Sequence, residues 1–212
     1  MTRRMLELFS GSGRMAQSFR DKGWRAETID SIRPASLQTD INKLTKEDII
    51  ALLGGEPDFI WMSPPCTAFS VASIGTHWGG GYRAYVPKTE GAILGLACLS
   101  SCDRIIKMFS KTLWVIENPR GIMRKMPNMV DKKRYTITFC QYGENRMKPT
   151  DLWTNLQSWE PKKPCKNGAD CHVPAPRGSK TGTQGLHSAY LRGILPQGFC
   201  EELSDYINNG GN

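Results

Sequence analysis

The sequence lacks the features that would place a protein in a membrane or mark it for export. No stretch approaches the roughly 18 consecutive apolar residues of a membrane-spanning helix. The first residues contain no apolar run of the signal-peptide type and lead directly into a strand-like segment. The chain also shows no internal repeat. We therefore expect a soluble, cytoplasmic protein with no membrane partner.

Cysteine occurs seven times, an odd number, at scattered positions. Without an export signal, this argues against a disulfide framework and favours reduced thiols with structural, catalytic or metal-binding roles. Acidic residues are fewer than basic ones, 20 against 28, so the net charge is +8. This balance favours a polyanionic partner, but on charge alone nucleic acid and a merely solvated basic surface are equally supported.

The order of apolar segments predicts an α/β fold with a mostly parallel sheet and helices on both faces. The length of 212 residues fits one domain with a small appendage. The predicted strands are residues 4–9, 24–29, 57–62, 113–116, 135–140 and 151–154. The predicted helices are residues 14–22, 46–53, 89–110 and 196–207. We assign residues 1–155 to a catalytic domain, 156–191 to a small irregular insert, and 192–212 to a C-terminal helix that packs back.

A glycine turn follows the first predicted strand. Gly11 and Gly13 let the backbone approach a ligand closely, and the next helix offers free N–H groups. A plain turn is equally well supported, since Ala16 replaces the last glycine of the G-x-G-x-x-G pattern. Asp30, at the end of the second strand, can accept hydrogen bonds from ribose hydroxyls, and Asp40 can accept one from an adenine amino group.

A second site follows the third predicted strand, where Pro64 and Pro65 stiffen the backbone before Cys66. The end of such a strand faces the ligand crevice of an open parallel sheet. A cysteine held there is well placed for nucleophilic catalysis if its thiolate is favoured. A buried structural cysteine is the alternative, and the two prolines favour catalysis.

Two further stretches carry polar side chains near strand ends. Glu117 ends an apolar strand, where its carboxyl can carry a proton or bind a heterocycle, or can simply cap a helix or lie at the surface. Arg146 and Lys148 are two positions apart, so an extended backbone would point both to one side, where they could bind a phosphate or a base.

In this order, the four stretches resemble the cytosine-5 DNA methyltransferase family over residues 4–155. Residues 9–13 resemble its cofactor-binding motif, and residues 64–66 its catalytic loop. Residues 117–119 resemble its partner motif, where Val is more common at the third position. Gln141 and Arg146 resemble its Gln-x-Arg-x-Arg stretch, with wider spacing and with Lys148 in place of an arginine.

The resemblance implies a Rossmann-like methyltransferase fold and methyl transfer from S-adenosylmethionine to carbon 5 of a flipped-out cytosine in double-stranded DNA. Cys66 would attack carbon 6, Glu117 would hold ring nitrogen 3, and Arg146 would hold the base or its phosphate. The implied cofactor-binding residues are Phe9, Ser10, Gly11, Gly13, Asp30, Asp40 and Pro64. The expected substrate-binding residues are Ser63, Pro65, Ser70, Asn118, Pro119, Gln141, Lys148, Arg177 and Lys180.

The match to the family is incomplete in the last quarter of the chain. Family members carry a sizeable target-recognition segment, whereas only about 35 residues, 157–191, are available here, and the family's Gly-Asn near the C-terminus is absent. We therefore expect a short, degenerate target or help from a partner. Residues 75–81 are the expected closing loop. Residues 177–185 suit phosphate contacts, with a solvated basic loop as the alternative.

The insert also contains Cys165, Cys171 and His172, a spacing that supplies three zinc ligands, with Cys140 or His187 as a fourth. The alternative is a loop with incidental thiols.

Two other functions stay open. The same chemistry can act on RNA or on a free cytosine nucleotide, or the chain can be a catalytically silent DNA- or protein-binding module. A small methyltransferase with no visible nuclease would suit protection of phage or mobile-element DNA from restriction.

Overall fold

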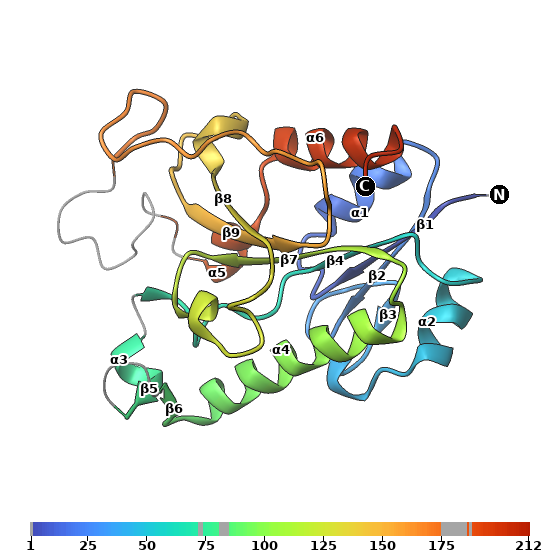
Figure 1. Cartoon of the computed structure of the whole chain (residues 1–212), viewed down its shortest axis with the longest axis horizontal. Helices are drawn as coiled ribbons and strands as arrows, with labels where there is room; N and C mark the ends of the chain where they lie inside the picture. The colour runs from blue at the N-terminus through green and yellow to red at the C-terminus, as the bar shows by residue number, and fades with distance from the viewer. Residues whose placement is uncertain (1, 72–73, 81–84, 175–185, 187) are drawn as a thin grey trace.

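The computed structural model describes residues 2–71, 74–80, 85–174, 186 and 188–212. Its centre is a seven-stranded sheet in the order β3-β2-β1-β4-β7-β9-β8 (Figure 1). The strands β1 to β4 and β7 are parallel, whereas β9 runs antiparallel to both of its neighbours. The strands of this sheet are β1 (Arg4–Leu8), β2 (Arg25–Asp30), β3 (Leu37–Gln38), β4 (Phe59–Met62), β7 (Leu113–Pro119), β8 (Arg134–Thr138) and β9 (Pro149–Thr154).

Helices cover both faces of the sheet, as predicted. Helices α2 and α4 lie on one face, and α1 and α6 on the other (Figure 1). The α-helices are α1 (Arg14–Arg20), α2 (Lys46–Leu53), α3 (Ile74–His77), α4 (Glu90–Met108), α5 (Ala189–Gly193) and α6 (Gln197–Asn208). Short elements complete the fold: the 3-10 helices η1 (Ile41–Lys43), η3 (Ile122–Lys125) and η4 (Phe139–Tyr142), and the pair β5 (Trp78–Gly79) and β6 (Val86–Pro87).

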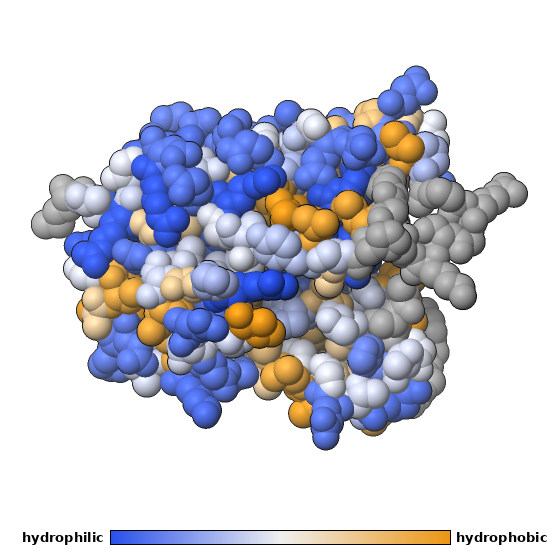
Figure 2. Space-filling model, turned by 180° about the vertical axis from the view of Figure 1, so that it is seen from behind, coloured by the Kyte–Doolittle hydropathy of each residue, from blue (hydrophilic) through white to orange (hydrophobic). Residues whose placement is uncertain are grey.

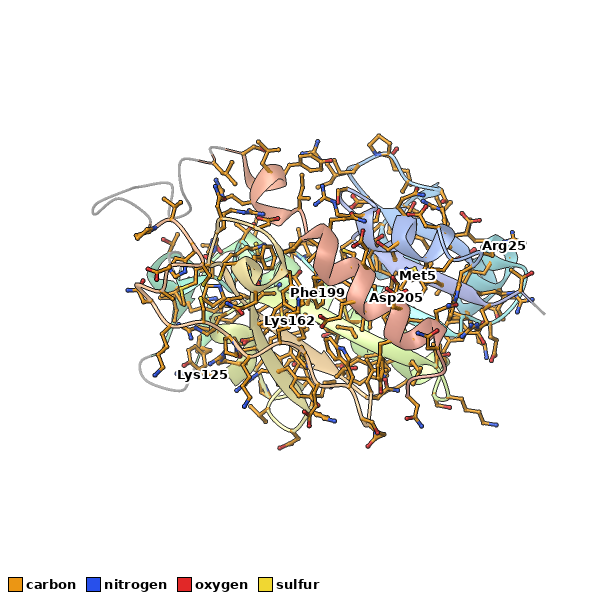
Figure 3. The ribbon with its side chains drawn as sticks, turned by 90° about the horizontal axis from the view of Figure 1, so that it is seen from above. Met5, Arg25, Lys125, Lys162, Phe199 and Asp205 are labelled. Atoms are coloured by element: carbon orange, nitrogen blue, oxygen red, sulfur yellow. The ribbon has the colours of Figure 1, made fainter. Side chains whose placement is uncertain are left out.

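The central strands are buried on both sides, which explains their continuous apolar sequences. Successive side chains of a strand point to opposite faces. In β1, Leu6 and Leu8 therefore join the core beneath α2 and α4, whereas Met5 joins the core beneath α1 and α6. Figure 3 shows α6, with Phe199, lying across the sheet near Met5.

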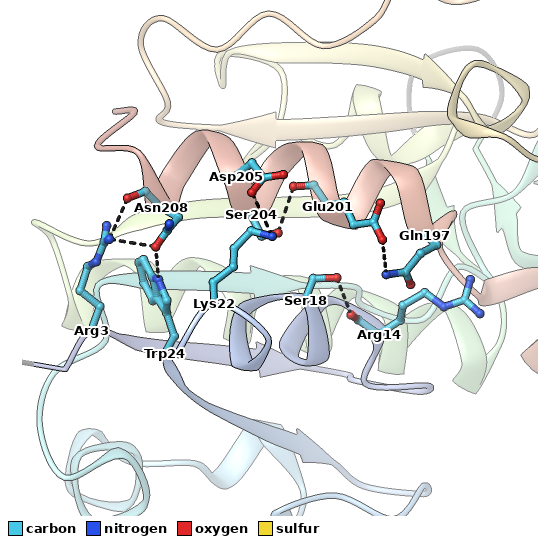
Figure 4. A network of polar contacts seen from close by, with 10 residues as sticks. All are labelled: Arg3, Arg14, Ser18, Lys22, Trp24, Gln197, Glu201, Ser204, Asp205 and Asn208. Atoms are coloured by element: carbon cyan, nitrogen blue, oxygen red, sulfur yellow. Dashed lines mark hydrogen bonds and ion pairs between the residues drawn. The ribbon is translucent and has the colours of Figure 1, made fainter.

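Polar contacts attach α6 to the start of the chain (Figure 4). The Arg3 guanidinium donates to the backbone carbonyl of Asn208 at 2.7 Å, and the Trp24 indole N–H donates to the Asn208 side chain at 3.0 Å. Lys22 and Asp205 form an ion pair at 3.0 Å. The first and last elements of the described chain are thereby held on the same face.

Local sequence explains where two helices begin. Thr45 and Asp48 form a capping box at α2, and Gly54, with φ of 70°, ends this helix. The Thr89 side chain accepts a hydrogen bond from the backbone N–H of Ala92 at the start of α4. The structure confirms the predicted boundaries of α2 and the predicted cap of α4.

The strand order reverses between β1 and β4, which makes this point the topological switch of the sheet. Ligands of open α/β sheets bind in the crevice at the carboxyl ends of the strands there. The fold is the predicted Rossmann-like one. No helix in the described part of the chain is both long and apolar enough to cross a membrane.

Several short elements were not predicted, among them β3, α3, β5 and β6, and the end of the predicted strand 135–140 lies in η4. Three further differences bear on the site or the insert. Strand β7 continues past Ile116 to Pro119, because β9 pairs with its last residues. Helix α5 was not predicted. In the segment assigned to the insert, Leu156 and Trp159 are buried in the core beneath α6.

Candidate active site

A cavity of about 330 Å³ opens at the carboxyl ends of the central strands. It collects segments that are far apart in the sequence: the glycine turn after β1, the loops after β2 and β4, the end of β7, and α5. The predicted site residues that line it are Phe9, Ser10, Gly11, Asp30, Ser63, Pro64, Pro65, Cys66, Glu117, Pro119 and Lys148. Most of the predicted site is therefore brought together in one place.

Asp30 organises one end of the cavity. Its carboxylate accepts hydrogen bonds from the backbone N–H groups of Gly11, Ile32 and Arg33 at 2.8–3.0 Å. The glycine turn is thereby tied to the loop after β2, and Gly11 has the positive φ, 52°, that this turn requires. A carboxylate has about four lone-pair sites, so one remains for a ligand hydroxyl.

Glu7 also lines this end of the cavity, and the sequence analysis missed it. Its side chain is buried, and burial raises its pKa to about 8. One carboxyl oxygen accepts the backbone N–H of Ala16 at 2.7 Å. The signal in the sequence was a lone charged residue inside the apolar strand β1.

Cys66 stands at the mouth of the cavity, with part of its surface exposed. Its carbonyl oxygen accepts the N–H groups of Phe69 and Ser70 at 2.9 and 3.0 Å, so the chain after it turns sharply. Loss of water around the sulfur raises the pKa of the thiol, and the charge of Glu117 raises it further. The ammonium of Lys148 lowers it.

Glu117 projects into the cavity from a buried position in β7. Burial raises the pKa of its carboxyl, while the Lys148 ammonium and the Ser63 hydroxyl oppose this shift. Its Oε1 atom is buried and has no hydrogen-bond partner among the described residues. Buried polar atoms are nearly always paired, so this oxygen is available for a ligand that fills the cavity.

Two hydrogen bonds hold the Cys66 loop against the segment after Glu117. The Asn118 side chain donates to the Pro64 carbonyl at 2.9 Å, and the Ile122 N–H donates to the Phe69 carbonyl at 2.9 Å. Ser70 forms a β-bridge with Gly121. Asn118 and Ser70, both predicted to bind substrate, are not among the residues that line the cavity, and they join the two segments that do.

Arg146 and Lys148 differ in their access to the cavity. Lys148 has a positive φ of 25°, lines the cavity, and is held 4.4 Å from the ring centre of Phe139. Arg146 is buried outside the cavity lining, where it pairs with Glu144. Its guanidinium donates to the carbonyls of residues 191, 192 and 194 at 3.3–3.4 Å. Arg146 also lies over the Phe139 ring, 5.4 Å from its centre, so both cations contact one aromatic side chain, but of the two only Lys148 lines the cavity.

The remaining predicted site residues lie elsewhere. Gly13 caps α1, and Asp40 caps η1 by accepting the Asn42 N–H at 3.0 Å; neither lines this cavity. Gln141 donates to the Cys171 sulfur at 3.4 Å. The described part of the expected closing loop, residues 75–80, contains most of α3 and β5. The predicted residues outside the described range are Arg177, Lys180 and His187, and Gly81 of the closing loop.

The chain is similar along almost its whole length to a viral protein. It is 27% identical over 218 aligned positions to the "Probable DNA (cytosine-5)-methyltransferase" of Frog virus 3 (isolate Goorha), covering 95% of this chain and 99% of that protein. The resemblance to the cytosine-5 DNA methyltransferase family is confirmed. No protein-family model matches the chain.

Two solved structures are also similar. The Dnmt2 methyltransferase of S. pombe has a TM-score of 0.48 and 16% identity, with 73% of this chain and 49% of that one covered. A DNMT2 mutant of Spodoptera frugiperda has a TM-score of 0.44 and 18% identity, with 76% and 53% covered. The chain thus spans about half the length of these two structures.

Proposed function

We propose that the protein transfers a methyl group from S-adenosylmethionine to carbon 5 of a cytosine in double-stranded DNA. The observation that carries this proposal is the cavity shared by Cys66, Glu117 and Lys148, with an unpartnered carboxyl oxygen on Glu117. A nucleophile, a proton carrier and a cation are the groups that attack on a cytosine ring requires.

The residues at the Asp30 end fit the cofactor. Asp30 keeps a lone pair for a ribose hydroxyl, and Gly11 allows close approach of the backbone. When bound, S-adenosylmethionine supplies an electrophilic methyl group. Phe9 and Pro64 supply apolar wall between this end and Cys66, so the donor and the nucleophile share one cavity.

Two side chains of the cavity match the attack on the base. The Cys66 thiolate forms a bond to carbon 6, and the electron pair of the ring double bond moves toward carbon 5 and ring nitrogen 3. Glu117, whose raised pKa favours the protonated carboxyl, hydrogen-bonds nitrogen 3 and stabilises the charge that develops there. Carbon 5 then takes the methyl group, whose bond to the sulfonium sulfur of the donor breaks. A base removes the proton from carbon 5, and that electron pair restores the ring double bond as the sulfur–carbon bond breaks and the thiolate leaves.

Arg146 and Lys148 were both predicted to bind a phosphate or a base, and of the two Lys148 lines the cavity. Its ammonium lowers the pKa of Cys66 and acts on Glu117 in the same cavity. We therefore assign it two roles, stabilisation of the thiolate and binding of the base or its phosphate. Arg146 acts on the site through α5, whose residues line the cavity.

The target atoms of cytosine lie inside a stacked duplex, so the base must be extruded into the cavity. The small insert supports a short, degenerate target sequence. We place this activity in the cytoplasm, where it would protect DNA from restriction. Restriction digestion of DNA from a host that expresses the protein tests this role, and unchanged cutting at many cytosine-containing sites would count against it.

The reaction is tested with methyl-labelled S-adenosylmethionine and separate samples of unmethylated DNA, RNA and free cytidine nucleotides. We expect 5-methylcytosine in DNA from the wild type and from Cys98→Ala, a thiol control in α4, and none from Cys66→Ala. Label in RNA or nucleotide only would identify the alternative substrate. DNA binding without transfer by the wild type would identify a silent binding module.

A further inference from the structure

Four metal-binding side chains meet away from the cavity. Cys140 belongs to η4, and Cys165, Cys171 and His172 come from the segment after β9. One ligand atom from each residue lies within 4.8 Å of the other three. The sequence alone left the fourth ligand open between Cys140 and His187. The geometry points to a structural zinc site made by Cys140, Cys165, Cys171 and His172. None of these four residues lines the methyl-transfer cavity.

The distances fit a single tetrahedral ion. Sulfur atoms bound to one zinc at about 2.3 Å lie about 3.8 Å apart, and a sulfur and a ring nitrogen lie about 3.6 Å apart. The Cys140 sulfur is 3.2 Å from that of Cys165 and 3.5 Å from that of Cys171. The Nδ1 atom of His172 is 3.6 Å from both the Cys165 and the Cys171 sulfur.

The ligand set selects the metal. Three thiolates and one imidazole in a closed tetrahedron are typical of structural zinc, whereas carboxylate oxygens suit magnesium and calcium. A catalytic zinc keeps an open position for water or substrate. Four protein ligands in this cluster leave no such position, so the site has a structural role.

The surrounding segment needs a cross-link of this kind. Residues 160–174 contain no helix or strand, and His172 is their only buried residue. A segment with almost no apolar core is not held by burial, and small irregular units use a metal or disulfides instead. The hydrogen bonds that join this segment to the rest of the fold include Lys162 N–H to the Tyr142 hydroxyl, Cys165 N–H to the Thr138 hydroxyl and Val173 N–H to the Asn145 carbonyl.

An outer contact completes the arrangement. The Gln141 amide donates to the Cys171 sulfur at 3.4 Å, as a hydrogen bond to a ligating thiolate would. Gln141 resembled a substrate-binding residue in the sequence, and the structure gives it this position beside the sulfur cluster. The site therefore fixes residues 165–172 of the insert on η4.

The test begins with metal content. Full-length protein, purified under reducing conditions without chelator from zinc-containing medium, should hold one zinc per chain by mass spectrometry. Cobalt exchanged into the protein should give the intense visible bands of tetrahedral thiolate coordination. Cys171→Ser and His172→Ala should lower zinc retention during dialysis against a chelator at least tenfold. Cys66→Ser, which removes an exposed thiol elsewhere, should retain zinc as the wild type does.

Three results would overturn the site. The first is a folded wild type without zinc that also gives no cobalt bands. The second is a disulfide between Cys140 and Cys165 or Cys171 in protein kept reduced. The third is full zinc retention in both Cys171→Ser and His172→Ala. The wild-type measurements keep the test decisive if the variants fail to fold, and none of them depends on methyl transfer.

Discussion

The side-chain amide of Asn118 donates a hydrogen bond to the backbone carbonyl of Pro64, 2.9 Å away. This bond joins the strand that carries Glu117 to the loop that carries Cys66, so the two reactive groups are positioned by neighbouring residues. Asn118 is fully buried. The Pro64 carbonyl that accepts its hydrogen bond lies in a loop and pairs with no neighbouring strand. The bond therefore sets the distance between nucleophile and proton carrier.

Asn118→Ala removes this donor. We expect the free energy of unfolding to fall by about 1–3 kcal/mol, the cost of an unsatisfied buried carbonyl. We also expect kcat to fall more than KM rises, because the loss acts on the alignment of Cys66 with Glu117. Urea unfolding and steady-state methyl transfer measure the two effects. If the variant is destabilised but its kcat is unchanged, Asn118 contributes to stability and not to catalysis.

Gly121→Ala tests the second contact between these segments. A Cβ atom at Gly121 would overlap the backbone carbonyl oxygen of Phe69, and backbone cannot move aside as a flexible side chain can. We expect a destabilisation of about 1–3 kcal/mol or more and a loss of activity. Gly75→Ala, where a Cβ meets open space, is the control and should unfold as the wild type does.

Lys148 and Glu117 should shift the pH profile of Cys66 in opposite directions. The ammonium lowers the pKa of the thiol, and the carboxylate raises it. Lys148→Met should therefore move the alkylation of Cys66 by iodoacetamide to higher pH and slow it severalfold at pH 7.5. Glu117→Gln should move it to lower pH, and Lys148→Arg should stay close to the wild type. Shifts of Lys148→Met and Glu117→Gln in the same direction would contradict this electrostatic account.

Glu7 makes stability depend on pH in a window fixed by its two pKa values. Its folded pKa of about 8 lies above the ordinary value of 4.5, so folding favours the protonated carboxyl. Its contribution is complete below pH 4.5 and is lost as pH rises through 8, by a few kcal/mol in all. Thermal unfolding from pH 5 to 9 without cofactor should show Glu7→Gln losing less stability than the wild type. Parallel curves would contradict the raised pKa.

Arg146 should affect cofactor binding through α5. Its guanidinium holds the carbonyls of residues 191, 192 and 194, and the cavity wall includes Tyr190 and Ile194. Arg146→Ala should weaken S-adenosylmethionine binding roughly tenfold, about 1.4 kcal/mol, in calorimetric titration. Arg134→Ala, at an exposed position of β8, is the control. Unchanged affinity with reduced kcat would instead indicate a direct role at the base.

The sequence predicted the elements whose formation depends on residues close together in the chain. The apolar run of β4 and the Thr45 and Thr89 caps depend on neighbouring residues, and the structure confirms them. Because parallel strands end at one edge, the positions of Asp30, Cys66 and Glu117 at strand ends were enough to predict a shared site.

The parts that were missed depend on contacts between distant segments. The extension of β7 to Pro119 needs β9 as its partner. The position of Arg146 outside the cavity lining depends on carbonyls of α5, more than 40 residues away, and that of Lys148 on a backbone turn. Helix α5 has five residues and no buried side chain, so it leaves no periodic signal.

The outer surface shows why the amino-acid composition alone says little about function. Figure 2 shows a face on which hydrophilic residues predominate and hydrophobic residues form separate small patches. A charge of +8 spread over such a surface does not by itself indicate where a polyanion binds. The catalytic groups inside the cavity carry that information instead.

The hydrogen bond between Arg3 and Asn208 has a practical consequence for engineering. It brings the two ends of the chain together at the edge of the sheet where the strands begin, whereas the cavity opens at the edge where they finish (Figure 1). A fluorescent tag or a DNA-targeting module attached at either end would therefore start from the same place. It would leave the mouth of the cavity clear, and its linker would have to run the length of a strand before the module could deliver a chosen sequence to Cys66.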